Sequence, residues 1–286
     1  MDNVLKTGFT TLLLLLCISA SQAINQKQAA PSLSAHEQRV RNLLELSGFN
    51  QQIDEFPNLI KQGVNAAVQA DDSAPATNLL QLLNAAIDKA VVPKEFKLAI
   101  GSALFNNLNA RNLNTLFSWY ESDLGKRITQ AEVAASSAEA MAEITNTISD
   151  LMSKTERVAL VQEIDNIVGA TDSALRIQAN TQLAIVTGMN KVSSPGQDVD
   201  IASLNKQIQA QIEQSRASVQ QIIIASFVYI YKNFSDEELK RYVKFLSSSS
   251  SKKFNRIAMD GIETEMKKAA SVIAETLSIK PKTQAQ

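Results

Sequence analysis

The chain has 286 residues, of which 45% are apolar, 20% charged and 5% aromatic, and its formal net charge is −1. Only 9 residues are Gly and 6 are Pro, which argues against turn-rich sandwiches, barrels and propellers. The near-zero charge removes the electrostatic basis of nonspecific nucleic-acid binding. We therefore expect long helices and no nucleic-acid partner.

Residues 1–23 have the pattern of a secretory signal peptide. Lys6 supplies a basic start, residues 12–16 are all leucine, and Ser21 and Ala23 are the small residues that signal peptidase reads. The apolar run is too short to span a bilayer, and we find none of spanning length after it. We expect cleavage after Ala23, a periplasmic or secreted bacterial protein, and no transmembrane segment in the mature chain. Cys17, the only cysteine, leaves with the signal.

Residues 24–33 are polar and predict a flexible leader, after which apolar residues repeat every three or four positions, as in amphipathic helices. Three Ser-x-x-Glu capping boxes, beginning at Ser34, Ser153 and Ser235, predict helix starts. Gly48 predicts a helix end. Pro93 is expected in a first helical turn, where its missing N–H is harmless.

The later part of the chain continues this helical pattern. Residues 123–152 form a long Ala-rich stretch, and residues 192–199 predict a loop because they contain Pro-Gly. Another long helix is expected from Asp200, including the apolar run 222–231, which is too short to cross a membrane and predicts a buried core helix. Residues 279–286 are expected to be a flexible tail. The predicted fold is all-α, a helical array or bundle of about ten helices.

An internal repeat appears when the chain is compared with itself at an offset of 126 residues. Apolar positions agree along residues 105–128, and several residues are identical, namely Asn107/Asn233, Leu113/Leu239, Ser122/Ser248 and Lys126/Lys252. This match predicts two helical repeats, residues 34–152 and 153–278. We expect them to pack around a pseudo-two-fold axis.

Two short motifs carry a family resemblance. The first repeat contains Trp119-Tyr120-Glu121-Ser122-Asp123-Leu124-Gly125-Lys126, and the second contains Ser235-Asp236-Glu237-Glu238-Leu239. These motifs resemble the family called domain of unknown function 2059, found in exported bacterial proteins, here as two diverged copies in tandem. The resemblance implies an α-helical exported protein and no particular activity. The chain departs from the family pattern at residues 109–112, which replace its Ser-x-Glu-Glu cap, and at serines 247–251, which replace its glycine.

This segment and its counterpart in the second repeat supply the candidate interaction or ligand contacts. They are Trp119, Tyr120, Ser122, Lys126, Tyr242, Phe245 and Lys252. Ser122 is suited to cap the helix that follows the aromatic pair. Lys126 lies in the first turn of that helix.

No recognised catalytic pattern stands out in the sequence. The only histidine is His36 at a helix start, and there is no Cys/His cluster, no glycine-rich phosphate loop and no Gly-x-Ser-x-Gly elbow. We expect a non-enzymatic protein without cofactor or metal. Its expected partner is an envelope protein or a second copy of itself. The alternative is a carrier that binds a lipid or other apolar ligand between its helices.

Overall fold

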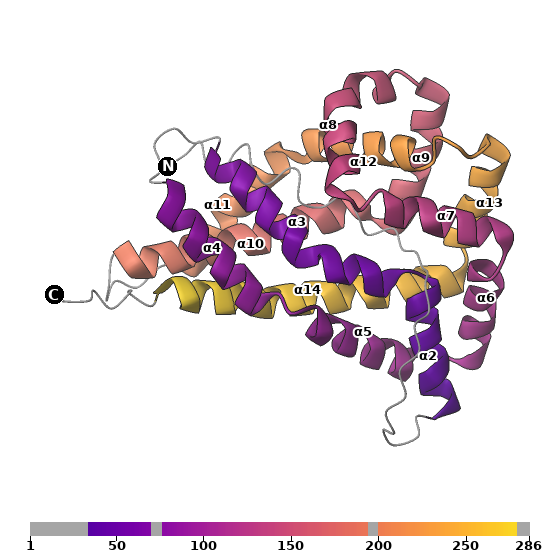
Figure 1. The fold of residues 1–286 in the computed structure, drawn as a ribbon, viewed down its shortest axis with the longest axis horizontal. Helices are drawn as coiled ribbons and strands as arrows, with labels where there is room; N and C mark the ends of the chain where they lie inside the picture. Colours follow the sequence, from indigo (N-terminus) through magenta and orange to yellow (C-terminus); the bar gives the residue numbers. More distant parts are fainter. Residues whose placement is uncertain (1–33, 70–75, 194–199, 279–286) are drawn as a thin grey trace.

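The protein is described from a computed structural model that covers residues 34–69, 76–193 and 200–278 (Figure 1). Every regular element within these ranges is an α-helix, so the all-α prediction is confirmed. The predicted signal, leader and tail lie outside the described residues. In chain order the helices are α2 (Ala35–Leu46), α3 (Phe49–Gln69), α4 (Ala76–Ala90), α5 (Pro93–Asn107), α6 (Ala110–Tyr120), α7 (Asp123–Ala134), α8 (Ala138–Met152), α9 (Thr155–Val168), α10 (Ala170–Ser193), α11 (Ile201–Gln214), α12 (Arg216–Ile230), α13 (Asp236–Leu246) and α14 (Ser249–Ser278).

Several helix ends follow directly from the local sequence. Gly48 follows α2 with a φ of 68°, a left-handed conformation that glycine adopts without strain. Pro93 is in the first turn of α5, as predicted. The side-chain oxygen of Ser34 accepts from the amide of Glu37, and Ser235 forms a complete capping box with Glu238. These local predictions are confirmed.

Other boundaries differ from the prediction. Ser153 does not cap α9, because its hydroxyl donates to the Asp150 carbonyl and so belongs to the end of α8. The Ala-rich stretch 123–152, for which no internal boundary was predicted, contains two helices, since Ser137 caps α8 after α7 has ended. The helix expected from Asp200 is also two, separated at Ser215, whose hydroxyl donates to Ile212. Of the predicted loop, residues 194–199 lie outside the described ranges and 192–193 belong to α10.

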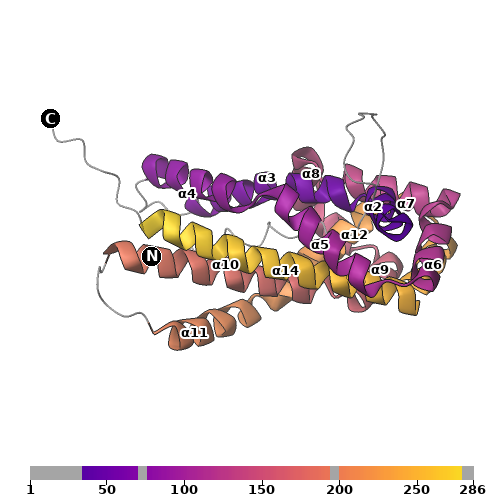
Figure 2. The ribbon, with the colours of Figure 1, turned by 90° about the horizontal axis from the view of Figure 1, so that it is seen from below.

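The long C-terminal helix α14 forms the spine of the molecule. Figure 2 shows α10 and α14 side by side, and α14 also packs against α4 and α5 from the first half of the chain. Reciprocally, α8 of the first half packs against α12 of the second half. Buried apolar residues from both halves therefore form one continuous cluster, which runs from Val40 to Ile273.

The short helices α6, α7 and α13 close one end of the molecule (Figure 1). Helix α12 is nearly apolar and is buried along most of its length, which confirms that the run 222–231 is a core helix. Helix α5, by contrast, packs on α2, α3 and α14 but keeps large apolar side chains at the surface. The exposed apolar side chains of α5 therefore mark a candidate site on this helix.

Candidate functional site

The predicted contact residues lie at two similar helix elbows. At the α6–α7 elbow, Ser122 accepts a hydrogen bond from the Gly125 amide at 3.0 Å and donates one to the Trp119 carbonyl at 2.6 Å. A Cβ placed on Gly125 would lie 2.0 Å from that same carbonyl oxygen, so no other residue fits without movement of the backbone. The glycine therefore allows the close approach at the α6–α7 elbow, whereas the equivalent position of the second half is Ser251.

The α13–α14 elbow repeats this arrangement 126 residues later. Ser248 accepts from the Ser251 amide at 3.2 Å, and its own amide donates to the Phe245 carbonyl at 2.9 Å. Helices α6 and α13 have the same length, and both begin with a capping box. In the first half this box is built from Asn109 and Asn112, where the family pattern has Ser and Glu.

Four of the predicted contact residues form one aromatic cluster between these elbows. The Trp119 ring stacks on Phe245 at 4.5 Å and on Tyr242 at 5.5 Å, and Tyr120 meets Phe245 edge-on at 5.7 Å. Tyr120, Tyr242 and Phe245 are buried. The cluster joins the two halves through packed rings, which fill part of the boundary between them.

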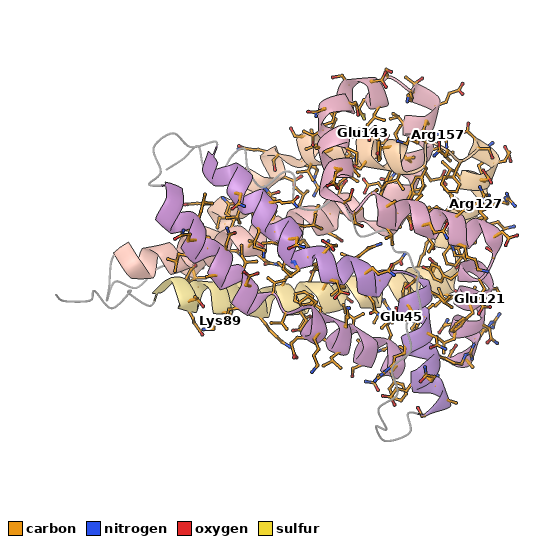
Figure 3. All side chains as sticks on the ribbon, in the orientation of Figure 1. Glu45, Lys89, Glu121, Arg127, Glu143 and Arg157 are labelled. Atoms are coloured by element: carbon orange, nitrogen blue, oxygen red, sulfur yellow. The ribbon has the colours of Figure 1, made fainter. Side chains whose placement is uncertain are left out.

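The lysines and Ser122 do not join this cluster. Lys126 and Lys252 are exposed at the starts of α7 and α14, and Ser122 serves as the cap described above. The neighbouring Arg127, labelled in Figure 3, forms an ion pair with Glu238 of α13 and lies over the Phe234 ring. The Arg127 side chain thus bridges the two halves.

Glu132 is a residue of this region that the sequence reading missed. Its carboxylate on α7 is 1% exposed and accepts hydrogen bonds from the hydroxyls of Tyr231 at 2.6 Å and Tyr242 at 2.8 Å. A signal was present, because Glu132 continues the buried stripe of Leu124 and Ile128 at four-residue spacing. It ties α7 to the helices of the second half.

An open groove of about 610 Å³ lies between α2, α3 and α5. Leu98 and Phe105 of α5 line it and are 54% and 37% exposed, which is unusual for side chains of this size. The His36 ring lies 5.2 Å from the Phe105 ring, and His36 Nε2 is 3.1 Å from the Phe105 carbonyl oxygen. The position of His36 beside the groove was not foreseen from the sequence.

The walls of this groove combine an apolar floor with charged edges. Val40 and Leu44 of α2 form the floor, and both are buried. Charged side chains of both signs line its edges: Glu37, Arg41, Glu45, Asp54, Lys94 and Lys97. Lys97 is paired with Asp54 at 2.6 Å, and Glu45, labelled in Figure 3, accepts a hydrogen bond from Asn50. An apolar floor between charged edges is typical of a surface that binds protein.

A second groove of about 430 Å³ lies between α5 and α14. It is lined by the small residues Ala99, Ala103 and Gly261 and by polar side chains such as Asp260. Neither Leu98 nor Phe105 lines it, so it offers less apolar surface to a partner.

Residues 34–69, 76–193 and 200–278 contain neither a candidate metal site nor a candidate membrane span. No three His, Cys, Asp or Glu side chains gather there as metal ligands would. No helix in these ranges combines the length and the apolar character needed to cross a bilayer.

Comparisons with known protein families, with curated proteins and with solved structures find no match. The resemblance to domain of unknown function 2059 therefore stays a prediction from the motifs.

Proposed function

We propose that this chain is an exported, non-enzymatic helical protein of the bacterial envelope, and that it binds another envelope protein through the α2–α3–α5 groove. The observation that carries the proposal is the exposure of Leu98 and Phe105 beside a buried apolar floor. Exposed apolar surface rimmed by polar residues commonly marks a protein-binding site. Export is supported by the signal pattern of residues 1–23 alone.

The shape of the groove favours a protein segment over a small ligand. Pockets for small molecules enclose most of the ligand, whereas this groove is open along its length between charged edges. The alternative, a carrier for a lipid or other apolar ligand, requires space between the two halves. The contact of Trp119 with Tyr242 and Phe245 already fills part of that boundary, so the carrier has less support.

Photo-crosslinking in cells that export the chain tests this proposal. A photoreactive phenylalanine analogue is placed at Leu98, and in a control at Leu82, which is 37% exposed on α4 and does not line the groove. We expect a reproducible crosslink to one envelope protein from Leu98 and none from Leu82. Equal products from both positions, or no product from Leu98, would contradict the proposal.

A further inference from the structure

We propose that the groove takes an amphipathic α-helix, which places a large apolar side chain over Gly101 and Ser102. This inference rests on the proposed function and specifies the chemistry of the partner. Three observations carry it: a comparison of the two halves, the helical walls of the groove, and the charges along its edges.

The comparison begins with the spacing of 126 residues. Adding 126 to the bounds of α6 gives the bounds of α13, and adding it to the start of α7 gives the start of α14. The hydrogen bonds around Ser122 and Ser248 correspond at the same spacing. At the same spacing α5 falls on residues 219–233, which cover most of α12 and the turn that follows it. Residues of α5 can therefore be compared with residues 126 positions later.

Four groove residues of α5 correspond to buried residues in α12 or directly after it. Gly101 and Ser102 fall on Phe227 and Val228, which are 2% and 1% exposed. Leu98 and Phe105 fall on Ile224 and Tyr231, which are likewise buried. Where α12 carries a phenyl ring and an isopropyl group, α5 therefore carries a hydrogen atom and a short hydroxymethyl group. The space that the second half fills with its own apolar side chains is open in the first half.

The missing volume predicts what enters the groove. A side chain of the size of Phe or Leu, brought by another chain, restores the packing that the second half achieves by itself. A Cβ on Gly101 would lie 3.6 Å from Leu44 Cδ1, an ordinary contact distance, so the floor at this point is apolar and within reach. Burying one such side chain contributes a large part of the affinity of a helix-in-groove complex.

The helical walls of the groove favour a helical occupant. Its walls are helices, and its exposed anchors Leu98 and Phe105 are seven residues apart on one face of α5. The charged residues of α2 also share one face of their helix, because Glu37, Arg41 and Glu45 follow each other at four-residue spacing. A third helix laid in the groove can contact both rows, whereas an extended strand finds no sheet edge among the described residues.

The edge charges specify the polar side of the partner. Acidic, basic and acidic groups alternate along α2, so the complementary helix carries a basic, an acidic and a basic residue at four-residue spacing. Lys94 on the opposite edge favours a further acidic residue. Pairs at an exposed edge contribute mostly to the choice and orientation of the partner, and the apolar anchor supplies the affinity.

Selection of displayed peptides tests this inference directly. A library of random 16-residue peptides is selected on the full mature chain and counter-selected on Ser102→Phe, which fills the groove from an exposed position. We expect peptides with large apolar residues at helical spacing and basic residues on the flank that faces Glu37 and Glu45. Their affinity should fall by about tenfold or more in Ser102→Phe and in Leu98→Lys, and stay unchanged in Leu82→Lys.

The outcomes separate this inference from the proposed function. Selected peptides that bind in the groove without helical periodicity would overturn the helical partner, while the crosslinking from Leu98 would still support an interaction protein. Peptides that bind Ser102→Phe and Leu98→Lys as well as the native chain would overturn the site. Circular dichroism and thermal unfolding of each variant establish that it is folded. If Ser102→Phe is not folded, Leu98→Lys replaces it in the counter-selection.

Discussion

The indole ring of Trp119 lies parallel to the phenyl ring of Phe245, with ring centroids 4.5 Å apart and 7° between the planes. The two residues are 126 positions apart, and each precedes a serine-capped elbow at the end of an 11-residue helix. If the halves are copies of one unit, as the sequence match predicts, equivalent residues meet here. A local two-fold axis of the pair would then pass between these two rings.

This stack should couple the two halves energetically. We expect Trp119→Leu and Phe245→Leu each to destabilise the protein by about 2 to 4 kcal/mol, because each removes a large packed ring. The double variant should lose less than the sum, with a coupling of about 0.5–1.5 kcal/mol. Urea unfolding of the four proteins measures this, and strict additivity would mean that the rings do not stabilise each other.

The elbow glycine should tolerate no side chain. Gly125→Ala puts a methyl group against the Trp119 carbonyl, and we expect a loss of about 3 kcal/mol from the resulting overpacking. Gly101→Ala is the matched control within a helix, since its new methyl group meets ordinary space. It should stabilise the protein by about 0.5–1 kcal/mol through helix propensity. Thermal unfolding compares the two, and similar effects of both changes would refute this account.

The ion pair between Arg127 and Glu238 should make stability depend on acid pH. The hydrogen bond from Arg127, together with the Ser235 amide, lowers the pKa of Glu238 from its usual 4.5 to about 2. A lowered pKa in the folded state stabilises the protein above pH 4.5, and this contribution is lost as the pH falls toward 2.

The variant Glu238→Gln keeps a capping side chain and removes the charge. We expect its melting temperature to lie below that of the native protein at pH 6, and the two to converge as the pH approaches 2. A constant difference across this range would show that the charge plays no part. Glu37→Gln, which changes a carboxylate in the first turn of α2, is the control.

The buried carboxylate of Glu132 should contribute to the free energy of unfolding. Glu132→Ala leaves the hydroxyls of Tyr231 and Tyr242 without their acceptor, and we expect a loss of about 2 kcal/mol or more. Glu163→Ala removes an exposed carboxylate from α9 and should change stability by less than about 0.5 kcal/mol. Equal losses in urea unfolding would indicate that burial of Glu132 has no special consequence.

The two halves should stay together after the chain is cut between them. A protease site placed at residues 153–154 separates α8 from α9 in the folded protein. Because α14 packs on α4 and α5 while α8 packs on α12, we expect both pieces to elute together in native buffer. Separation without denaturant would mean that each half keeps its own core.

Much of the helical framework was predictable because its causes are local. Ser235 caps α13 with a partner three residues away, and Gly48 ends α2 through its own backbone freedom. The elbow that joins Trp119, Ser122 and Gly125 is likewise decided within seven residues. Ser153 shows the limit even here, since its hydroxyl had two possible partners and bonds to the preceding helix.

Packing between distant helices decided the rest. The sequence singled out Trp119 and Phe245 but did not show that they meet. The stripe that contains Glu132 likewise did not show that Tyr231 and Tyr242 bind its carboxylate. The groove is a similar case, because Leu98 and Ile224 have the same apolar character and only their neighbours leave one exposed. Helix formation depends on hydrogen bonds between residues a few positions apart, so the sequence by itself determined the all-helical fold and several of the helix ends. Exposure depends on which faces meet across the whole chain, so the tertiary structure alone decided where a binding surface remained open.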